Sequence, residues 1–378
     1  MSAYRFGNGK IIVDGRTWEG AEIQVAQGRI TALSRQRAMT GDAIDLDGGW
    51  LMPGFVDTQV NGGGGTLFND DPSVEGIARI GAAHAAFGTT AFLPTLISDR
   101  PDRIAQALAA SDAAIAAGMA GVVGIHVEGP CLSAARKGIH DSAHFRRLDA
   151  EMVALLTRPH RGVVMVTLAP EHADAGAIAA LVAAGVRVSA GHTDLSYAEA
   201  RAAFGAGVTG VTHLFNAMPP LHHREPGIAG AALEDPAPWC GLFVDGVHVS
   251  PAMLRIAMRA RGTERMMLVT DAMPSVGARE KDFVLQGRQI RVADGKAYYD
   301  DGTLAGADLD MASAVANCVT MLGLTGETAS ALASTNPAAF LGLDRERGAL
   351  APGLRAEWVQ LDRHLRPRGT WIGGRRAA

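Results

Sequence analysis

The chain has 378 residues, a net charge of −4 at neutral pH and 48% hydrophobic residues, enough for the core of one large domain plus a smaller one. This charge offers no basic surface for nucleic acid, and the longest apolar stretch, residues 175–186, is too short to cross a membrane. The three cysteines are far apart and the N-terminal residues lack the apolar core of a signal peptide, so we expect a reducing, cytoplasmic setting.

Both ends of the sequence have the pattern of β structure. Residues 1–51 contain short runs with alternating β-branched residues, separated by Gly and Asp, and residues 347–378 have the same character. The sequence between them follows a different pattern. We therefore predict that residues 1–51 and 347–378 together form one small β-sandwich domain.

Residues 52–346 alternate short apolar runs with Ala-rich helical stretches. Eight strands alternating with helices over this length predict a (β/α)₈ TIM-like barrel. A doubly wound open sheet is the alternative, and it is disfavoured because no GxGxxG motif follows a predicted strand. The eight apolar runs lie near residues 54–60, 88–95, 121–129, 162–171, 185–193, 207–216, 239–248 and 265–273.

Helix starts and one interruption can also be placed in this part of the chain. Asp71 and Pro72 predict an N-cap and first-turn pair for a helix after the first strand, and Pro101 opens the next helix. Residues 276–305 break the alternation of strands and helices, so we predict a hairpin insertion after the eighth strand. A further helix is expected to begin near Met311.

Polar side chains of the metal-ligand or acid–base type end several of the predicted strands. Glu128 ends the third, His192 the fifth, His213 lies in the sixth and Asp271 ends the eighth. Each alone has an ordinary alternative, because a single histidine near a strand end is more often a structural residue and a carboxylate can cap a turn. Catalytic groups of such barrels come from the carboxyl ends of the strands, so all four would point into one mouth. We predict that they share a metal site.

The residue types indicate hydrolysis of an amide. One carboxylate and two imidazoles leave a divalent ion an open coordination position, and such an ion lowers the pKa of water to roughly 7. Asp271 is expected to take a proton from this water and pass it to the leaving nitrogen. His140, in the loop after the third strand, is our candidate partner of the amide carbonyl, and an exposed loop histidine is the alternative interpretation.

Six segments, in a fixed order, make the sequence similar to a known family: PGFVDTQVNGGGG, HVEGPCLSAARKGIH, SAGHT, THLFNAMPP, VDGVHV and VTDAM. They resemble the N-acetylglucosamine-6-phosphate deacetylase family of the amidohydrolase superfamily, over about residues 50–340. The resemblance implies hydrolysis of N-acetyl-D-glucosamine 6-phosphate to D-glucosamine 6-phosphate and acetate, in amino-sugar catabolism or recycling. An amidohydrolase acting on another N-acyl amino sugar or an N-acyl amino acid is the alternative.

The resemblance also implies roles for individual residues. Glu128, His192 and His213 would ligate the metal, Asp271 would be the catalytic acid and base, and His140 would polarise the acetyl carbonyl. Arg224 and His248 would contact the phosphate and sugar, with one of them reaching across the interface of a homodimer. From chemistry alone Arg224 suits phosphate, although it can equally pair with Glu225. The implied substrate-binding residues are Ile139, His140, Asn216, Ala217, Arg224, His248, Leu304, Ala305 and Gly306.

The sequence departs from the pattern of related sequences in two respects. Many superfamily members carry His-x-His in the first strand and hold two metals, whereas this chain has Gln59 and Asn61 there. We therefore expect one divalent ion per subunit, Zn²⁺ first with Fe²⁺, Co²⁺ or Mn²⁺ as alternatives, and a weak second-site contact through Gln59 stays open. The second departure is Cys131, where a bulky apolar residue is expected, and we favour a packing role over contact with substrate or a soft metal.

Other functions of barrels fit the sequence less well. A phosphosugar isomerase or aldolase needs a proton-shuttling base or a Schiff-base lysine, and none of the eight predicted strand ends carries Lys. A non-catalytic scaffold would have lost its ligands, and all four central residues are present. The sequence therefore predicts a metal-dependent enzyme.

Overall fold

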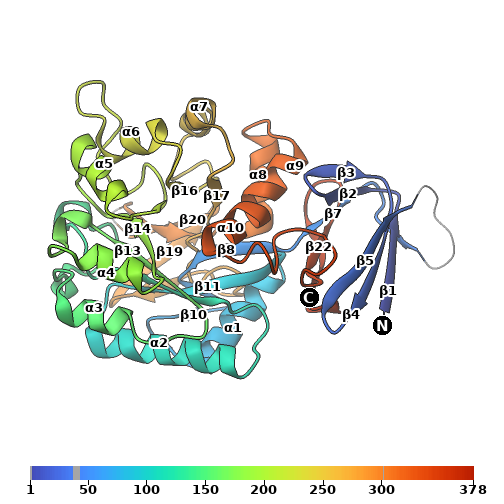
Figure 1. Ribbon diagram of the computed structural model, residues 1–378, viewed down its shortest axis with the longest axis horizontal. Coiled ribbons are helices and arrows are strands. Elements are labelled where there is room, and N and C mark those ends of the chain that lie inside the picture. Colours follow the sequence, from blue (N-terminus) through green and yellow to red (C-terminus); the bar gives the residue numbers. More distant parts are fainter. Residues whose placement is uncertain (1, 37–42, 301) are drawn as a thin grey trace.

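A computed structural model describes residues 2–36, 43–300 and 302–378. Figure 1 shows a large part in which helices surround a barrel of strands, and a smaller part built of strands that contains both chain ends. Residues 1 and 37–42 of the predicted β domain, and residue 301 of the predicted hairpin insertion, lie outside the described residues.

Strands from both ends of the chain build the small β domain. One sheet has the order β5-β4-β1-β6 and the other has the order β24-β23-β22-β7-β2-β3. Alternate residues of β4 are buried, and they join Phe6 and Trp358 in a separate core. The strands are β1 (Ser2–Gly7), β2 (Lys10–Val13), β3 (Arg16–Trp18), β4 (Ala21–Ala26), β5 (Arg29–Arg35), β6 (Ile44–Asp45), β7 (Trp50–Pro53), β22 (Trp358–Leu361), β23 (Pro367–Ile372) and β24 (Arg375–Arg376).

Eight parallel strands, one in each of the predicted runs, form the barrel in sequence order. The barrel closes where Val60 pairs with Ala272 and where the Thr270 hydroxyl donates to the carboxylate of Asp57 over 2.5 Å. Burial raises the pKa of Asp57 to about 7. The predicted (β/α)₈ fold with a small terminal β domain is therefore confirmed. The strands are β8 (Phe55–Val60), β11 (Thr89–Ile97), β12 (Gly124–Glu128), β13 (Val163–Leu168), β14 (Arg187–Ala190), β15 (Gly210–Val211), β16 (Trp239–Leu242) and β17 (Met266–Leu268).

Helices cover the outside of the barrel and bury their apolar faces in the main core (Figure 1). The first of them begins after Ser73, not after the predicted cap Asp71. The Ser73 hydroxyl accepts a first-turn N–H over 3.0 Å, whereas the Asp71 carboxylate pairs with Arg79. The second begins at Pro101, as predicted. The helices are α1 (Val74–Ala85), α2 (Pro101–Ala116), α3 (Ala150–Leu156), α4 (Ala177–Ala183), α5 (Tyr197–Gly205), α6 (Gly227–Glu234), α7 (Pro251–Arg261), α8 (Met311–Thr320), α9 (Gly326–Ser330) and α10 (Asn336–Leu341).

An antiparallel sheet is inserted between β17 and α8, with the order β18 (Phe283–Leu285), β19 (Arg288–Ala293), β20 (Lys296–Tyr298) and β21 (Leu304–Ala307). It packs on the barrel through a small core that joins Leu285 and Tyr299 to Ile97 and Met273. A bridge between Ala272 and Ala307 ties the last strand to the segment after β17. This arrangement brings β21 to the carboxyl-end mouth of the barrel.

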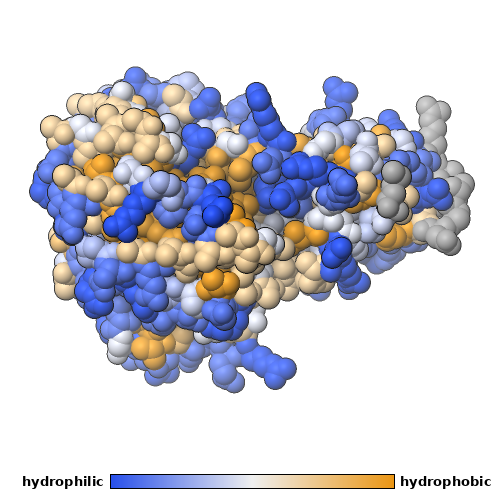
Figure 2. Space-filling view, turned by 60° about the horizontal axis from the view of Figure 1, so that its bottom comes forward, coloured by the Kyte–Doolittle hydropathy of each residue, from blue (hydrophilic) through white to orange (hydrophobic). Residues whose placement is uncertain are grey.

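Figure 2 shows how polar and apolar side chains are distributed over one face of the molecule. Hydrophilic side chains cover much of that face, and hydrophobic side chains are visible mainly in the centre of the larger part. The most exposed large apolar side chains, Val284 at 54% and Ile256 at 49%, belong to β18 and α7. Within the described ranges, no helix has the length and apolar character that crossing a bilayer requires.

Candidate metal centre and active site

The ends of four barrel strands bring ionisable side chains to one cavity of about 220 Å³. Glu128 is the last residue of β12, His192 and His213 follow β14 and β15, and Asp271 follows β17. Glu128, His192 and His213 are at most 5% exposed. The four predicted residues thus lie together. The cavity is lined by Glu128, Gly138, Ile139, His140, His192, His213, Asn216, Ala217, Phe243, His248, Asp271, Leu304 and Gly306.

Three of these side chains form a compact triangle of ligand atoms. Nε2 of His213 lies 3.1 Å from Nε2 of His192 and 3.2 Å from Oε1 of Glu128. The third side, from His192 Nε2 to Glu128 Oε1, measures 3.3 Å. Ligand atoms about 2.0–2.1 Å from a tetrahedral Zn²⁺ are separated by ~3.3 Å. The donor types and their spacing therefore fit one divalent ion.

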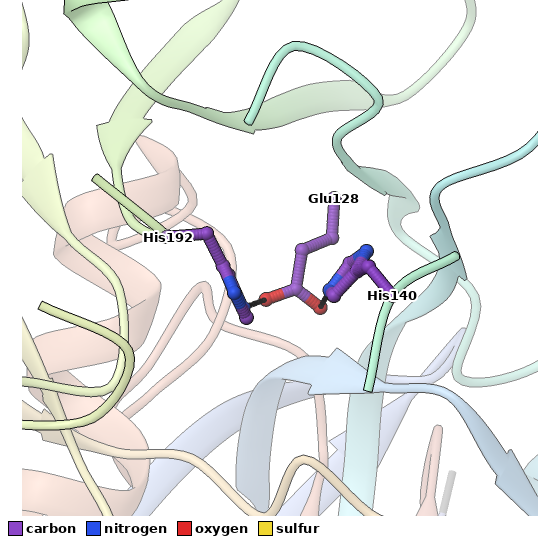
Figure 3. A group of neighbouring side chains, drawn as sticks. All are labelled: Glu128, His140 and His192. Carbon is purple, nitrogen blue, oxygen red and sulfur yellow. Dashed lines mark ion pairs between the residues drawn. The ribbon is translucent and has the colours of Figure 1, made fainter. Parts of the chain in front are cut away.

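His140 faces the other oxygen of Glu128. Figure 3 shows the carboxylate between His192 and His140, and Nε2 of His140 lies 4.0 Å from Oε2 of Glu128. The ligand atoms of these three residues lie within 4.8 Å of one another, so they also form a potential metal group. The triangle that includes His213 is tighter. The geometry therefore favours His213 as the third ligand and leaves His140 free to contact substrate.

The backbone presents these residues in an uncommon conformation. His192, His213 and Asp271 have φ angles of +49°, +32° and +47°, in the left-handed region that non-glycine residues rarely adopt. Such residues cluster at functional sites, where the surrounding structure holds them in place. Gly129 follows Glu128 with φ +84°, and a Cβ there would lie 2.2 Å from the Ser98 hydroxyl oxygen, so only glycine fits this turn.

Hydrogen bonds clearly orient one candidate ligand, His192. Nδ1 of His192 lies 2.8 Å from the carbonyl oxygen of Arg136, so Nδ1–H is the donor and Nε2 of the neutral ring has a free lone pair. Nδ1 of His213 is buried and has no hydrogen-bond partner among the described residues. Both rings nevertheless present Nε2 to Glu128.

The charges in the site favour a cation beside Glu128. Burial acts to raise the pKa of Glu128, but its close contacts with the His192 and His213 rings hold that pKa well below its ordinary value. Burial acts to lower the pKa of His213, and the hydrogen bond and charge of Glu128 outweigh it, so that pKa is raised. An ionised Glu128 that attracts a proton onto His213 would equally attract a divalent ion.

Asp271 is held by two amides from the end of β8. Nε2 of Gln59 donates to Oδ1 of Asp271 and to Oε1 of Glu128, each over 3.0 Å, and Nδ2 of Asn61 donates to the same Asp271 oxygen over 2.5 Å. Burial, and then repulsion from Glu128, raise the pKa of Asp271. Because the amide nitrogens face the carboxylates, Gln59 presents donors to the site and not a metal-ligating oxygen.

His140 is fixed by Ser98, which sequence reasoning did not identify. The backbone N–H of Ser98 donates to Nδ1 of His140 over 3.2 Å, so the proton of the neutral ring is on Nε2, which faces the cavity. Burial, and then His192, lower the pKa of His140 well below its ordinary value, which keeps the ring neutral. Ser98 directly follows β11. The rule that catalytic groups follow the carboxyl ends of barrel strands (the strand-end rule), applied to the second strand, would therefore have found it.

The predicted substrate contacts divide into two groups. Most of them line the cavity, whereas Ala305 is fully buried beside it. Arg224 is exposed in the segment 219–226 and does not line the cavity. His248 lines the cavity, and its Nδ1 lies 2.6 Å from Oδ2 of Asp245. The predicted residues that line the cavity are Ile139, His140, Asn216, Ala217, His248, Leu304 and Gly306.

Cys131 does not line the cavity. Its side chain is 2% exposed within the main core, and burial raises the pKa of the thiol to about 12. A protonated thiol in an apolar core is neither a good nucleophile nor a good metal ligand. These observations support the packing interpretation of Cys131.

The chain is similar to known enzymes over nearly its whole length. Residues 50–377 match the amidohydrolase family. The chain is 40% identical over 371 residues to an N-acetylgalactosamine-6-phosphate deacetylase of Shewanella sp. (strain ANA-3), covering 97% of this chain and 93% of that protein. It is 36% identical over 383 residues to an N-acetylglucosamine-6-phosphate deacetylase of Mus musculus, covering 96% and 93%.

A solved structure agrees with the fold as well. An aspartate-to-alanine mutant of N-acetyl-D-glucosamine-6-phosphate deacetylase from Mycobacterium smegmatis, in complex with N-acetyl-D-glucosamine-6-phosphate, matches with a TM-score of 0.91 and 34% identity. The match covers 100% of both chains.

Proposed function

Starting from the fact that the chain belongs to the amidohydrolase family, we propose that it hydrolyses N-acetyl-D-glucosamine 6-phosphate to D-glucosamine 6-phosphate and acetate. The observation that carries the proposal is the group of Glu128, His192 and His213 with Asp271 and His140 around one cavity. The chain that holds this group is 36–40% identical to deacetylases of N-acetylhexosamine 6-phosphates.

One divalent ion, Zn²⁺ by first choice, fits the triangle of Glu128, His192 and His213. When bound, it would act as a Lewis acid on the acetyl carbonyl and lower the pKa of water to roughly 7. Fe²⁺, Co²⁺ and Mn²⁺ suit the same ligand types. The amide donors at Gln59 and Asn61 support a single ion per subunit.

In this proposal Asp271 transfers the proton and His140 stabilises the negative charge that develops on the carbonyl oxygen. Asp271 accepts a proton from the attacking water and then donates it to the leaving nitrogen, and its raised pKa suits both steps. The Nε2–H of His140 donates to the carbonyl oxygen as negative charge develops on it. Leu304 and Gly306 of β21 line the cavity on the side of the inserted sheet, where they would limit access of bulk water.

The sugar phosphate needs a cationic group beyond the metal triangle. His248 lines the cavity, while Arg224 is exposed outside it in the same protomer. We infer a homodimer in which Arg224 of each subunit completes the phosphate site of the other. A guanidinium suits this role because it binds phosphate in a bidentate manner.

The buried, free cysteines of the described chain suit a reducing, cytoplasmic compartment.

Acetate release from N-acetylglucosamine with and without the 6-phosphate tests the function, measured after metal removal and readdition. We expect turnover of the phosphorylated sugar that depends on metal and falls steeply without the phosphate. N-acetylgalactosamine 6-phosphate and an N-acyl amino acid test the alternatives in the same assay. No turnover of any amide with Zn²⁺, Fe²⁺, Co²⁺ or Mn²⁺ would refute the proposal.

Mixing two inactive variants tests the contribution of Arg224 across the interface. If Arg224 acts on the partner's site, heterodimers of Arg224→Ala and Asp271→Asn contain one complete site and regain activity. If it acts within its own subunit, every site in the mixture lacks one residue and activity stays lost. Arg259→Ala, which changes an exposed arginine of α7, is the matched control and is expected to behave as wild type.

A further inference from the structure

Glu171 lies at the end of the fourth barrel strand, outside the cavity, and the proposed mechanism does not use it. It belongs to the short 3₁₀ helix Pro170–His172, which begins two residues after β13. Its carboxylate accepts a hydrogen bond from the Thr193 hydroxyl over 2.6 Å and another from the backbone N–H of Asp194 over 2.7 Å. These are the two residues that directly follow His192.

Glu171 contacts the turn at residues 192–194, whose backbone conformation is unfavourable by itself. His192 has a φ angle of +49°, and L residues leave this region unless neighbouring contacts hold them there. Thr193 is fully buried, so without Glu171 its hydroxyl would have to find another partner away from water. Hydrogen bonds to an ionised carboxylate are among the strong ones. Glu171 therefore stabilises the strained turn at His192.

The same turn is joined to the loop that orients the His192 ring. The Asp194 carboxylate accepts from Nε of Arg136 over 2.8 Å, and the carbonyl oxygen of Arg136 accepts from Nδ1 of His192 over 2.8 Å. The backbone N–H of Ser133 donates to the carbonyl oxygen of His192 over 2.9 Å. Segment 133–136 therefore holds the ring and the backbone of His192, but it contacts the following residues through the exposed ion pair of Arg136 with Asp194. Glu171 holds these following residues, Thr193 and Asp194, by hydrogen bonds.

We propose that Glu171 is a positioning residue for the metal site, which fixes His192 in the orientation that completes the triangle with Glu128 and His213. The inference rests on the proposed metal site and extends it to a residue that touches neither metal nor substrate. Loss of such an outer partner commonly weakens metal binding by about 10- to 100-fold.

Zn²⁺ affinity, measured on the full-length protein by competition with a chromophoric chelator, tests this role. Glu171→Ala is expected to weaken Zn²⁺ binding by about 10- to 100-fold, with kcat largely restored at saturating Zn²⁺. Glu171→Gln keeps one acceptor and is expected to lose less. Glu199→Ala is the matched control, because Glu199 also accepts from a hydroxyl and a backbone N–H, both of Ser196, but at the start of α5.

The outcomes separate the two proposals. If wild-type protein binds no Zn²⁺, the metal site itself is wrong. If wild type binds Zn²⁺ and both Glu171 variants bind it as tightly, only the role of Glu171 is refuted. The role is also refuted if Glu199→Ala weakens Zn²⁺ binding as much as Glu171→Ala, since the effect would then follow general loss of stability. If Glu171→Ala does not fold, Glu171→Gln decides by the same comparison.

Discussion

Gln59 and Asp271 are joined by a hydrogen bond of 3.0 Å from the amide Nε2 to the carboxylate Oδ1. Asn61 donates to the same oxygen, and no hydrogen bond among the described residues reaches Oδ2. The amides therefore fix the orientation of the carboxylate and leave Oδ2 as the oxygen that can exchange a proton with water. In this chain Gln59 and Asn61 orient the proposed base, Asp271, at positions where two histidines would bind a second metal.

Replacing the base is expected to remove activity and leave the metal in place. Asp271→Asn keeps the size of the side chain and its contacts with the β8 amides, but it removes the group that accepts the proton. We expect kcat to fall by about 10²- to 10⁴-fold. Steady-state kinetics and metal analysis of the same preparation check this. A variant that retains Zn²⁺ and more than a tenth of wild-type kcat would mean that another group is the base.

Restoring imidazoles in the first strand is expected to create a second metal site. The double variant Gln59→His/Asn61→His exchanges two hydrogen-bond donors for two ligands beside Asp271 and Glu128. We expect about one Zn²⁺ per subunit in wild type and about two in the double variant, measured by elemental analysis after equilibrium dialysis. Equal metal content in the two proteins would contradict the interpretation that the amides prevent binding of a second ion.

The strand-end rule located the candidate ligands because each of them directly follows an apolar run. Glu128, His192, His213 and Asp271 needed only the order of strands and the barrel to be placed in one mouth. The backbone hydrogen-bond partner of His192 could not be placed in this way. The Arg136 carbonyl that accepts from His192 belongs to the short 3₁₀ helix Ala134–Arg136, and a backbone carbonyl has no signal in the sequence.

The N-cap of α1 and the position of Arg224 could not be predicted from the sequence, for two different reasons. Asp71 and Ser73 are both good N-cap residues. The Asp71 carboxylate forms an ion pair with Arg79 of α1, and Ser73 caps the helix. Arg224 was assigned to phosphate by resemblance, yet one protomer leaves it exposed and outside the cavity. In the proposed homodimer Arg224 acts between subunits, and the pattern of one chain does not place such a residue.

His140 is expected to contribute to the chemical step more than to binding. Its Nε2–H points into the cavity because Ser98 occupies Nδ1, and an asparagine side chain would be too short to replace it. His140→Asn should lower kcat by about 10²- to 10³-fold with a smaller change in KM. His144→Asn alters a part-exposed histidine of the same loop and is the matched control. Equal kinetics of the two variants would remove His140 from the mechanism.

From the buried ring of His84 we predict that the free energy of unfolding falls in mild acid, independently of catalysis. Its ring is fully buried in α1, with Nε2 2.9 Å from the Gly62 carbonyl oxygen, and burial lowers its pKa from 6.5 to about 4. The unfolded chain therefore binds a proton that the folded chain rejects between about pH 6.5 and 4. Stability falls as the pH decreases through this window, by about 2 kcal/mol between pH 7 and 5.

A variant without the titrating ring measures this contribution. His84→Gln keeps a donor for the Gly62 carbonyl and does not ionise, so its free energy of unfolding should depend less on pH than that of wild type. Urea unfolding of both proteins at pH 7 and pH 5, with metal removed, gives the two differences, and groups common to both proteins cancel in the comparison. We expect wild type to lose about 2 kcal/mol more than the variant. Equal losses would mean that His84 is protonated in the folded protein, and that its burial does not keep the ring neutral.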